Sequence, residues 1–158
     1  MQRLSALPYL FLLLAPGLAL AATPARVVGI TDGDTIKVVA EGKQIKIRLH
    51  GIDAPEKGQP FGSVATQGLG SLLAGRQVSF ERTDTDRYGR TVALITADGI
   101  DVNRAMVANG LAWVFTRYCK QAFCAEWQRD EQAAKAARKG LWHDPEPVAP
   151  WEWRKQGK

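Results

Sequence analysis

Cysteine and histidine are scarce in this sequence of 158 residues, which contains two of each. Protein zinc sites draw mainly on these two residue types. Because His50 and His143 lie far from the cysteines in the sequence, a zinc site is not expected. Long apolar runs are also lacking: the N-terminal apolar stretch is short and is broken by Pro16 and Gly17. That length is too small for a comfortable membrane-spanning helix.

Residues 1–21 are instead typical of a signal peptide. Arg3 precedes an apolar run at 10–14, and the small residues Ala19 and Ala21 predict cleavage near Ala21/Ala22. A retained N-terminal anchor is the alternative. No cysteine stands directly after the predicted cleavage point, which argues against a lipoprotein. We therefore expect a periplasmic or secreted chain without stable membrane insertion.

Cys119 and Cys124 have four residues between them. In an oxidising compartment such a pair is expected to form a disulfide. Half of a metal site is the other interpretation.

The charge balance is mildly basic. The sequence has 21 Lys and Arg against 16 Asp and Glu, a formal net charge of +5. This excess favours contact with a polyanion but does not establish it, because many basic exported proteins bind no nucleic acid.

Alternating and β-branched stretches predict five strands, and apolar residues at helical spacing predict three helices. The strands are expected at 25–31, 34–40, 44–50, 76–83 and 90–96, and the helices at 62–73, 101–108 and 123–139. Three strands, a helix and two strands is the order of a five-stranded Greek-key barrel of the OB type. We therefore predict an α+β domain over 22–142. Residues 111–118 are expected to be extended. The Pro- and Trp-rich tail, 143–158, is expected to be extended over the surface or loose.

Charged residues gather in the predicted turns. Asp32 and Asp34 lie in the first turn, Asp53 and Glu56 in a Pro- and Gly-containing loop, and Asp86 and Arg90 in a later turn. Strand periodicity places Asp34 on the face of Ile36 and Val38, and it places Arg48 opposite Ile47 and Leu49. Gly33 is expected to help the first turn.

These groups suit a phosphate site with a hard metal ion. Carboxylate oxygens are the ligands that Ca²⁺ and Mg²⁺ prefer, and the guanidinium fork of arginine matches two phosphate oxygens. Each turn taken alone is more often an ordinary solvated hairpin than a ligand loop. Spacing alone does not decide whether the groups belong together.

The segments "TDGDTIKV" (31–38), "IRLHGIDAPE" (47–56) and "TDRYGR" (85–90) resemble, in order and spacing, the three signature segments of the staphylococcal-type thermonuclease family. The resemblance extends from Val27 to Trp142. It implies an OB-type barrel with three helices and a calcium-dependent nuclease.

The family roles carry over position by position. Asp34, Asp53 and the backbone carbonyl of Ala54 match calcium ligands, with Asp32 beside them. Glu56 matches the residue usually assigned as general base, an assignment that has been debated. Arg48 and Arg90 match the arginines that bind the scissile phosphate. Tyr118 and Tyr88 are expected to contact substrate, and a further family tyrosine position falls on Thr116.

By the same resemblance, the enzyme would hydrolyse DNA or RNA, preferring single-stranded or frayed regions and leaving 3′-phosphates; the sequence leaves the choice between DNA and RNA open. We expect a monomer. The alternative is a non-catalytic OB-fold module that binds single strands. Such a module would have no use for the combined set of acids and arginines. A calcium-stabilised structural protein would leave both arginines without a role.

Overall fold

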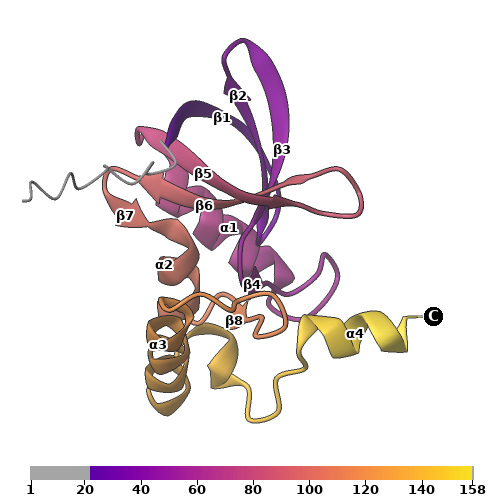
Figure 1. The fold of residues 1–158 in the computed structure, drawn as a ribbon. Helices are drawn as coiled ribbons and strands as arrows, with labels where there is room; N and C mark the ends of the chain where they lie inside the picture. The colour runs from indigo at the N-terminus through magenta and orange to yellow at the C-terminus, as the bar shows by residue number, and fades with distance from the viewer. Residues whose placement is uncertain (1–21, 158) are drawn as a thin grey trace, which may run out of the picture.

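In a computed structural model, which describes residues 22–157, five strands close into a barrel (Figure 1). They are β1 (Thr23–Asp32), β2 (Thr35–Ala40), β3 (Lys43–Leu49), β5 (Val78–Thr85) and β6 (Thr91–Ala97). Neighbours in the order β3-β2-β1-β5-β6 pair antiparallel, and a parallel pairing of β3 with β6 closes the ring. The predicted α+β, OB-type barrel is confirmed. The predicted signal peptide, residues 1–21, lies outside the described residues.

Short strands and helices complete the domain. β4 (Ile52–Asp53) pairs with β8 (Trp113–Val114), and β7 (Ile100–Asp101) pairs with β6. The helices are α1 (Gly62–Leu73), α2 (Val102–Ala108), α3 (Cys124–Ala136) and α4 (Pro150–Gln156), with a 3₁₀ helix η1 at Gly140–His143. Within residues 22–157 there is thus one α-helix more than predicted. No helix in this range is both long and apolar enough to cross a membrane.

The barrel interior follows the alternation of the sequence. Ile36, Val38, Ile47 and Leu49 are at most 1% exposed, as strand periodicity predicts. Burying each such side chain contributes about 1.5–3 kcal/mol. Helix α1 lies between β3 and β5 in the chain and contacts β1. The same alternation turns Arg48 away from these aliphatic side chains, at the point where β3 meets both β2 and β6.

The tail does not run extended over the surface throughout its length, and that expectation is wrong. Pro150 is the first residue of α4, a position where the fixed φ of proline favours a helix. Trp151 then stacks on Phe115, with ring centroids 5.2 Å apart and planes at 6°. Local proline content predicted an irregular tail, whereas contact with a distant aromatic side chain stabilises a helix.

Two other boundaries differ from expectation. The last predicted helix ends at Ala136 rather than at residue 139, and Arg138 has a φ of 50°. Only Trp113 and Val114 of the stretch 111–118 form a strand. The chain turns back at 116–118, where the Cys119 amide donates to the Phe115 carbonyl at 2.9 Å.

Cys119 and Cys124 form a disulfide, and their Cα atoms are 5.7 Å apart. The bond packs against Gly51, which has a φ of +70°, and a Cβ added there would lie 2.8 Å from the Cys119 sulfur. Glycine is therefore required at this position for its backbone conformation and for the close approach. The disulfide fixes the segment after β8 against the loop that leads from β3 to Asp53.

Reduction of this disulfide is expected to lower the free energy of unfolding by about 2 kcal/mol, the chain-entropy value for a loop this short. Denaturant unfolding with and without reductant measures the loss. The double variant C119A/C124A should lose a similar amount and should not respond to reductant. Equal stability of the oxidised and reduced protein, or two titratable thiols in protein purified without reductant, would contradict the assignment.

Candidate active site

The turn between β1 and β2 brings Asp34 to the site. A Cβ added to Gly33 would lie 2.7 Å from the Ala54 Cβ and 2.8 Å from the Ala65 Cβ. Among the described residues, Gly33 is not one of the glycines with positive φ. The glycine therefore permits a close approach between the turn, the loop after β4 and helix α1, rather than an unusual turn conformation.

Asp34 is only 7% exposed. Its carboxylate accepts hydrogen bonds from the Ala54 amide at 2.8 Å and the Thr35 hydroxyl at 3.1 Å, and it pairs with Arg48. Burial raises the pKa of Asp34; Arg48 opposes this, and the neighbouring Asp32 and Asp53 raise the pKa further. The crowded carboxylates make the surroundings of Asp34 favourable for a cation.

Arg48 joins two of the carboxylates. One terminal nitrogen of its guanidinium pairs with Asp34, and the other donates to Asp53 at 2.8 Å. Burial lowers the pKa of Arg48, but Asp34 and Asp53 outweigh this effect and hold the pKa above its ordinary value. The guanidinium is therefore a permanent positive charge between two buried acids.

Glu56 lies at the edge of the same group. Its backbone amide donates to the Gln59 side chain at 2.9 Å, which fixes the loop independently of the carboxylate. The carboxylate pairs with Arg154 of α4, a residue that the sequence did not suggest. With 36% of its side chain exposed, Glu56 can reach water in the cavity.

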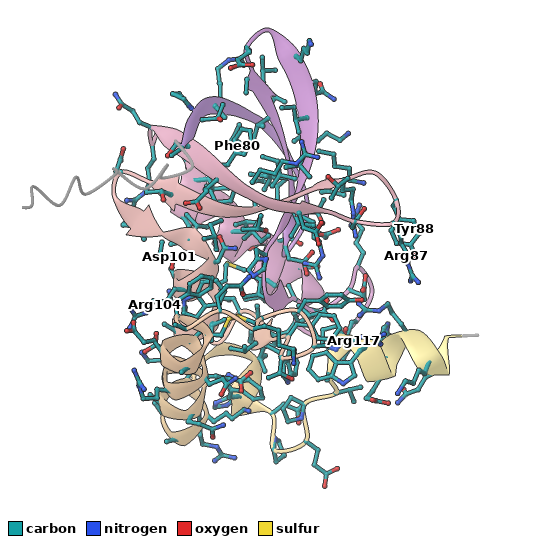
Figure 2. All side chains as sticks on the ribbon, in the orientation of Figure 1. Phe80, Arg87, Tyr88, Asp101, Arg104 and Arg117 are labelled. Carbon is teal, nitrogen blue, oxygen red and sulfur yellow. A yellow bond between two sulfur atoms is a disulfide. The ribbon has the colours of Figure 1, made fainter. Side chains whose placement is uncertain are left out.

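Arg90 comes from the β5–β6 turn. Its side chain donates to Asp86 at 2.6 Å, and its backbone amide donates to the other oxygen of the same carboxylate at 2.9 Å. Burial raises the pKa of Asp86, but hydrogen bonds from Arg90 lower it more, so the pKa lies below the usual range. Arg87 and Tyr88 project from the tip of this hairpin, on the side of the molecule where α4 lies (Figures 1 and 2).

The predicted side chains line one cavity of about 690 Å³. Its lining includes Asp32, Asp34, Arg48, Asp53, Glu56, Tyr88, Arg90 and Tyr118. Ala54 is 3% exposed and lies just behind them, with its amide bonded to Asp34. Four segments that are separate in the sequence therefore meet at one place.

Several lining residues were missed by the sequence analysis. They are chiefly aromatic or cationic: Phe115, Arg117, Trp151 and Arg154. Thr116, where the first of the two family tyrosine positions falls, is not among the lining residues, whereas Phe115 is. A proline followed directly by tryptophan in the tail was the available signal for α4, since proline is common at the first position of a helix.

The donor chemistry of the acids fits a hard divalent cation, because every side-chain donor is a carboxylate oxygen. In the described part of the chain, no three His, Cys, Asp or Glu side chains are arranged to hold a metal ion. Arg48 bonds to both Asp34 and Asp53, and Arg154 bonds to both Asp53 and Glu56. The positive charge among these acids is thus supplied by guanidinium groups.

Comparison with known proteins identifies relatives over most of the chain. A family described as "Staphylococcal nuclease homologue" matches residues 46–144. Protein ParB of Escherichia coli is 42% identical over 147 residues, which cover 87% of this chain and 82% of the relative. A protein named micrococcal nuclease from Shigella flexneri is 40% identical over 141 residues, which cover 84% of this chain and 80% of the relative.

An uncharacterized endonuclease of Escherichia coli O157:H7 is 43% identical over 130 residues, which cover 82% of this chain and 83% of the relative. The residues matched by the family, 46–144, include Arg48, Asp53, Glu56 and Arg90. The family match, the barrel and the relatives agree, and the chain belongs to the staphylococcal nuclease family.

Proposed function

We propose that this protein is a calcium-dependent nuclease that hydrolyses phosphodiester bonds in DNA or RNA. The observation that carries the proposal is the meeting of Asp34, Asp53, Glu56, Arg48 and Arg90 in one cavity. Family membership and relatives named as nucleases support it.

The two arginines would bind the substrate phosphate. A phosphodiester is an anion that repels an attacking hydroxide, and negative charge increases on its equatorial oxygens in the transition state. Arg48 and Arg90 carry guanidinium groups, whose geometry matches phosphate oxygens. Because both groups are partly buried, their attraction for the phosphate is screened less than at an open surface.

Glu56 would act as general base. Its carboxylate is exposed enough to accept a proton from a water molecule in the cavity, and such help contributes about 10²–10⁴ in rate. The Gln59 side chain holds the backbone of Glu56 in place, so the loop geometry does not depend on the charge of the carboxylate.

Asp34 and Asp53, with the Ala54 carbonyl, would hold the Ca²⁺ ion, and Asp32 would support them. When bound, the ion supplies positive charge that stabilises the transition state. The buried Asp34 carboxylate, crowded by Asp32 and Asp53, supports a cation at this place.

The walls of the cavity support an extended, unpaired strand as substrate. Tyr88 and Tyr118 are 70% and 59% exposed, so a large part of each side chain is accessible to bases. Base–aromatic stacking favours single-stranded or frayed regions. The family resemblance further suggests cleavage on the 5′ side of phosphorus, which leaves 3′-phosphates.

A binding module without catalysis is the alternative. The exposed tyrosines and the arginines would serve such a module equally well. The acids argue against it, because a module that only binds phosphate has no use for carboxylates in its cavity, which oppose the binding of an anion.

Purified protein is expected to cleave denatured DNA in the presence of Ca²⁺ and to stop when a calcium chelator is added. Product length on a gel, followed by analysis of the phosphate ends, measures both the activity and the 3′-phosphate. Restoring Ca²⁺ should restore cleavage. Full activity in chelator would contradict the metal assignment, and binding without cleavage would favour the binding module.

The disulfide supports a periplasmic or secreted location, because such bonds persist in oxidising compartments. Cleavage of residues 1–21 and a monomeric state stay predictions of the sequence.

A further inference from the structure

A third arginine, Arg154 of helix α4, reaches the acids of the cavity. One terminal nitrogen donates to Asp53 at 2.7 Å. The other donates to Glu56 at 2.5 Å and lies 3.3 Å from the second oxygen of Asp53. Arg154 is 101 positions from Asp53 in the chain. None of the roles proposed above uses this guanidinium.

Packing holds α4 where Arg154 can make these contacts. Pro150 is buried, and Trp151 stacks on Phe115. Trp151 also makes an edge-to-face contact with Trp113, with ring centroids 6.4 Å apart. The Val148 carbonyl, just before the helix, accepts a hydrogen bond from Gln59 at 2.6 Å. Residues three positions apart share a helix face, and accordingly both Trp151 and Arg154 line the cavity.

These contacts leave Asp53 surrounded by guanidinium groups. Its side chain is 1% exposed, with one oxygen accepting from Arg48 at 2.8 Å and the other from Arg154. A divalent cation bound to the same carboxylate would lie a few ångströms from both guanidinium groups, where like charges repel strongly. Binding of Ca²⁺ through Asp53 therefore requires one arginine to move away.

Of the two arginines bonded to Asp53, Arg154 can move away at a lower cost in free energy than Arg48. The Arg48 side chain is 15% exposed, and its backbone is paired on both sides, with β2 and with β6. Arg154 is 44% exposed and lies on a helix of 7 residues. Water replaces the lost partners of an exposed guanidinium more readily than those of a buried one.

We propose that Arg154 belongs to the active site as a resident cation: it neutralises Asp53 and Glu56 when no metal ion is bound, and Ca²⁺ displaces it. The inference rests on the proposed calcium site. Displacement frees Asp53 for the ion and frees Glu56 from its ion pair, so metal binding and release of the base occur together. Helix α4 is thereby part of the metal response of the enzyme.

The test is the calcium affinity of the Arg154→Gln variant, measured by isothermal titration with CaCl₂ and without substrate. The apparent affinity of a site falls by the fraction of molecules in which it is open. A site closed by Arg154 in about four of five molecules would thus bind Ca²⁺ about fivefold more tightly in the variant. Arg154→Lys keeps the positive charge but lacks the forked guanidinium. The calcium affinity of this variant should lie between those of the wild-type protein and Arg154→Gln.

Two matched controls separate displacement from general charge effects. Lys155→Gln removes the next charge of the same helix, where Lys155 pairs with Glu152 at 2.9 Å. Arg117→Gln removes a charge from the same cavity, where the guanidinium lies 5.7 Å from the centre of the Tyr118 ring. Both should bind Ca²⁺ within about twofold of the wild-type protein, because neither charge competes directly for the carboxylates.

Unchanged or weaker affinity in Arg154→Gln would overturn the inference, as would equal tightening in Arg117→Gln. If calcium binds the wild-type protein normally in those cases, the proposed function stands without this inference. If neither the wild-type protein nor Arg154→Gln binds Ca²⁺ at millimolar concentration, the proposed calcium site itself is wrong.

Discussion

Glu56→Gln is expected to lower kcat by about 10²–10⁴, the usual contribution of a general base. Glutamine keeps the size and hydrogen-bonding reach of the side chain, but its amide cannot accept the proton of an attacking water. KM should change much less, because the arginines that would bind the phosphate are untouched. Steady-state cleavage of a short single-stranded DNA with saturating Ca²⁺ measures both constants.

The control for this variant is Asp84→Asn, which neutralises another carboxylate that lines the same cavity. Asp84 accepts only its neighbour's backbone amide, that of Thr85, at 2.7 Å in the described structure. Its replacement should alter kcat by no more than about threefold, since an exposed charge is strongly screened. Equal losses in the two variants would show a general charge effect instead of a positioned base. Full activity in Glu56→Gln would remove Glu56 from the mechanism.

Arg90→Ala is expected to reduce kcat/KM by about 10²–10³ or more, the cost of removing one donor that stabilises transition-state charge. The loss should appear mainly in kcat, because the charge that Arg90 would stabilise increases on the way to the transition state. The same cleavage assay at varied substrate concentration measures it. The β5–β6 turn should survive, because Asp86 still accepts backbone amides from residue 90 and Tyr88, each at 2.9 Å.

Arg87→Ala is the matched control, because Arg87 belongs to the same hairpin and lines the same cavity. Its guanidinium lies over the ring of Tyr88, 4.9 Å from the ring centre. Loss of this charge should weaken substrate binding by a small factor and reduce the dependence of binding on salt concentration, without a large effect on kcat. If Arg90→Ala is as active as Arg87→Ala, Arg90 is not a transition-state ligand.

Glu56→Gln and Arg90→Ala are expected to disturb the stability of the fold less than a replacement of Arg48 would. Arg48 is bonded to both Asp34 and Asp53, whose side chains are 9% and 1% exposed. Removing its charge leaves two buried carboxylates with less compensation, which destabilises the fold as well as the site. Arg90 and Glu56 are more exposed and therefore test catalysis with less effect on stability.

Local patterns in the sequence determined most of the barrel. Side chains alternate along a strand, so Asp34 lies on the side of the buried Ile36 and Val38, and Arg48 points away from the buried Ile47 and Leu49. Helix α1 begins and ends where its apolar spacing predicted, at Gly62 and Leu73. The carboxylates and arginines were also evident, because the sequence gives the identity of each residue directly.

Tertiary structure alone decided how these groups meet. The parallel pairing of β3 with β6 closes the barrel and involves residues more than 40 positions apart, such as Ile47 and Thr91. Gly33 appeared to serve its own turn, whereas its role is to permit contact with Ala54 and Ala65. Neither relation leaves a periodic signal, because both depend on segments that are distant in the sequence.

The tail shows the same limit most clearly. Its prolines predicted irregular chain, and seven residues are too few for a helix to be stable alone in water. Stacking of Trp151 on Phe115 and pairing of Arg154 with Asp53 and Glu56 stabilise α4 in the folded protein. The sequence thus determined the strand faces and the chemistry of the site. Long-range packing decided that the C-terminal helix supplies Arg154 to the cavity, since only the closed fold brings that helix within reach of the acids.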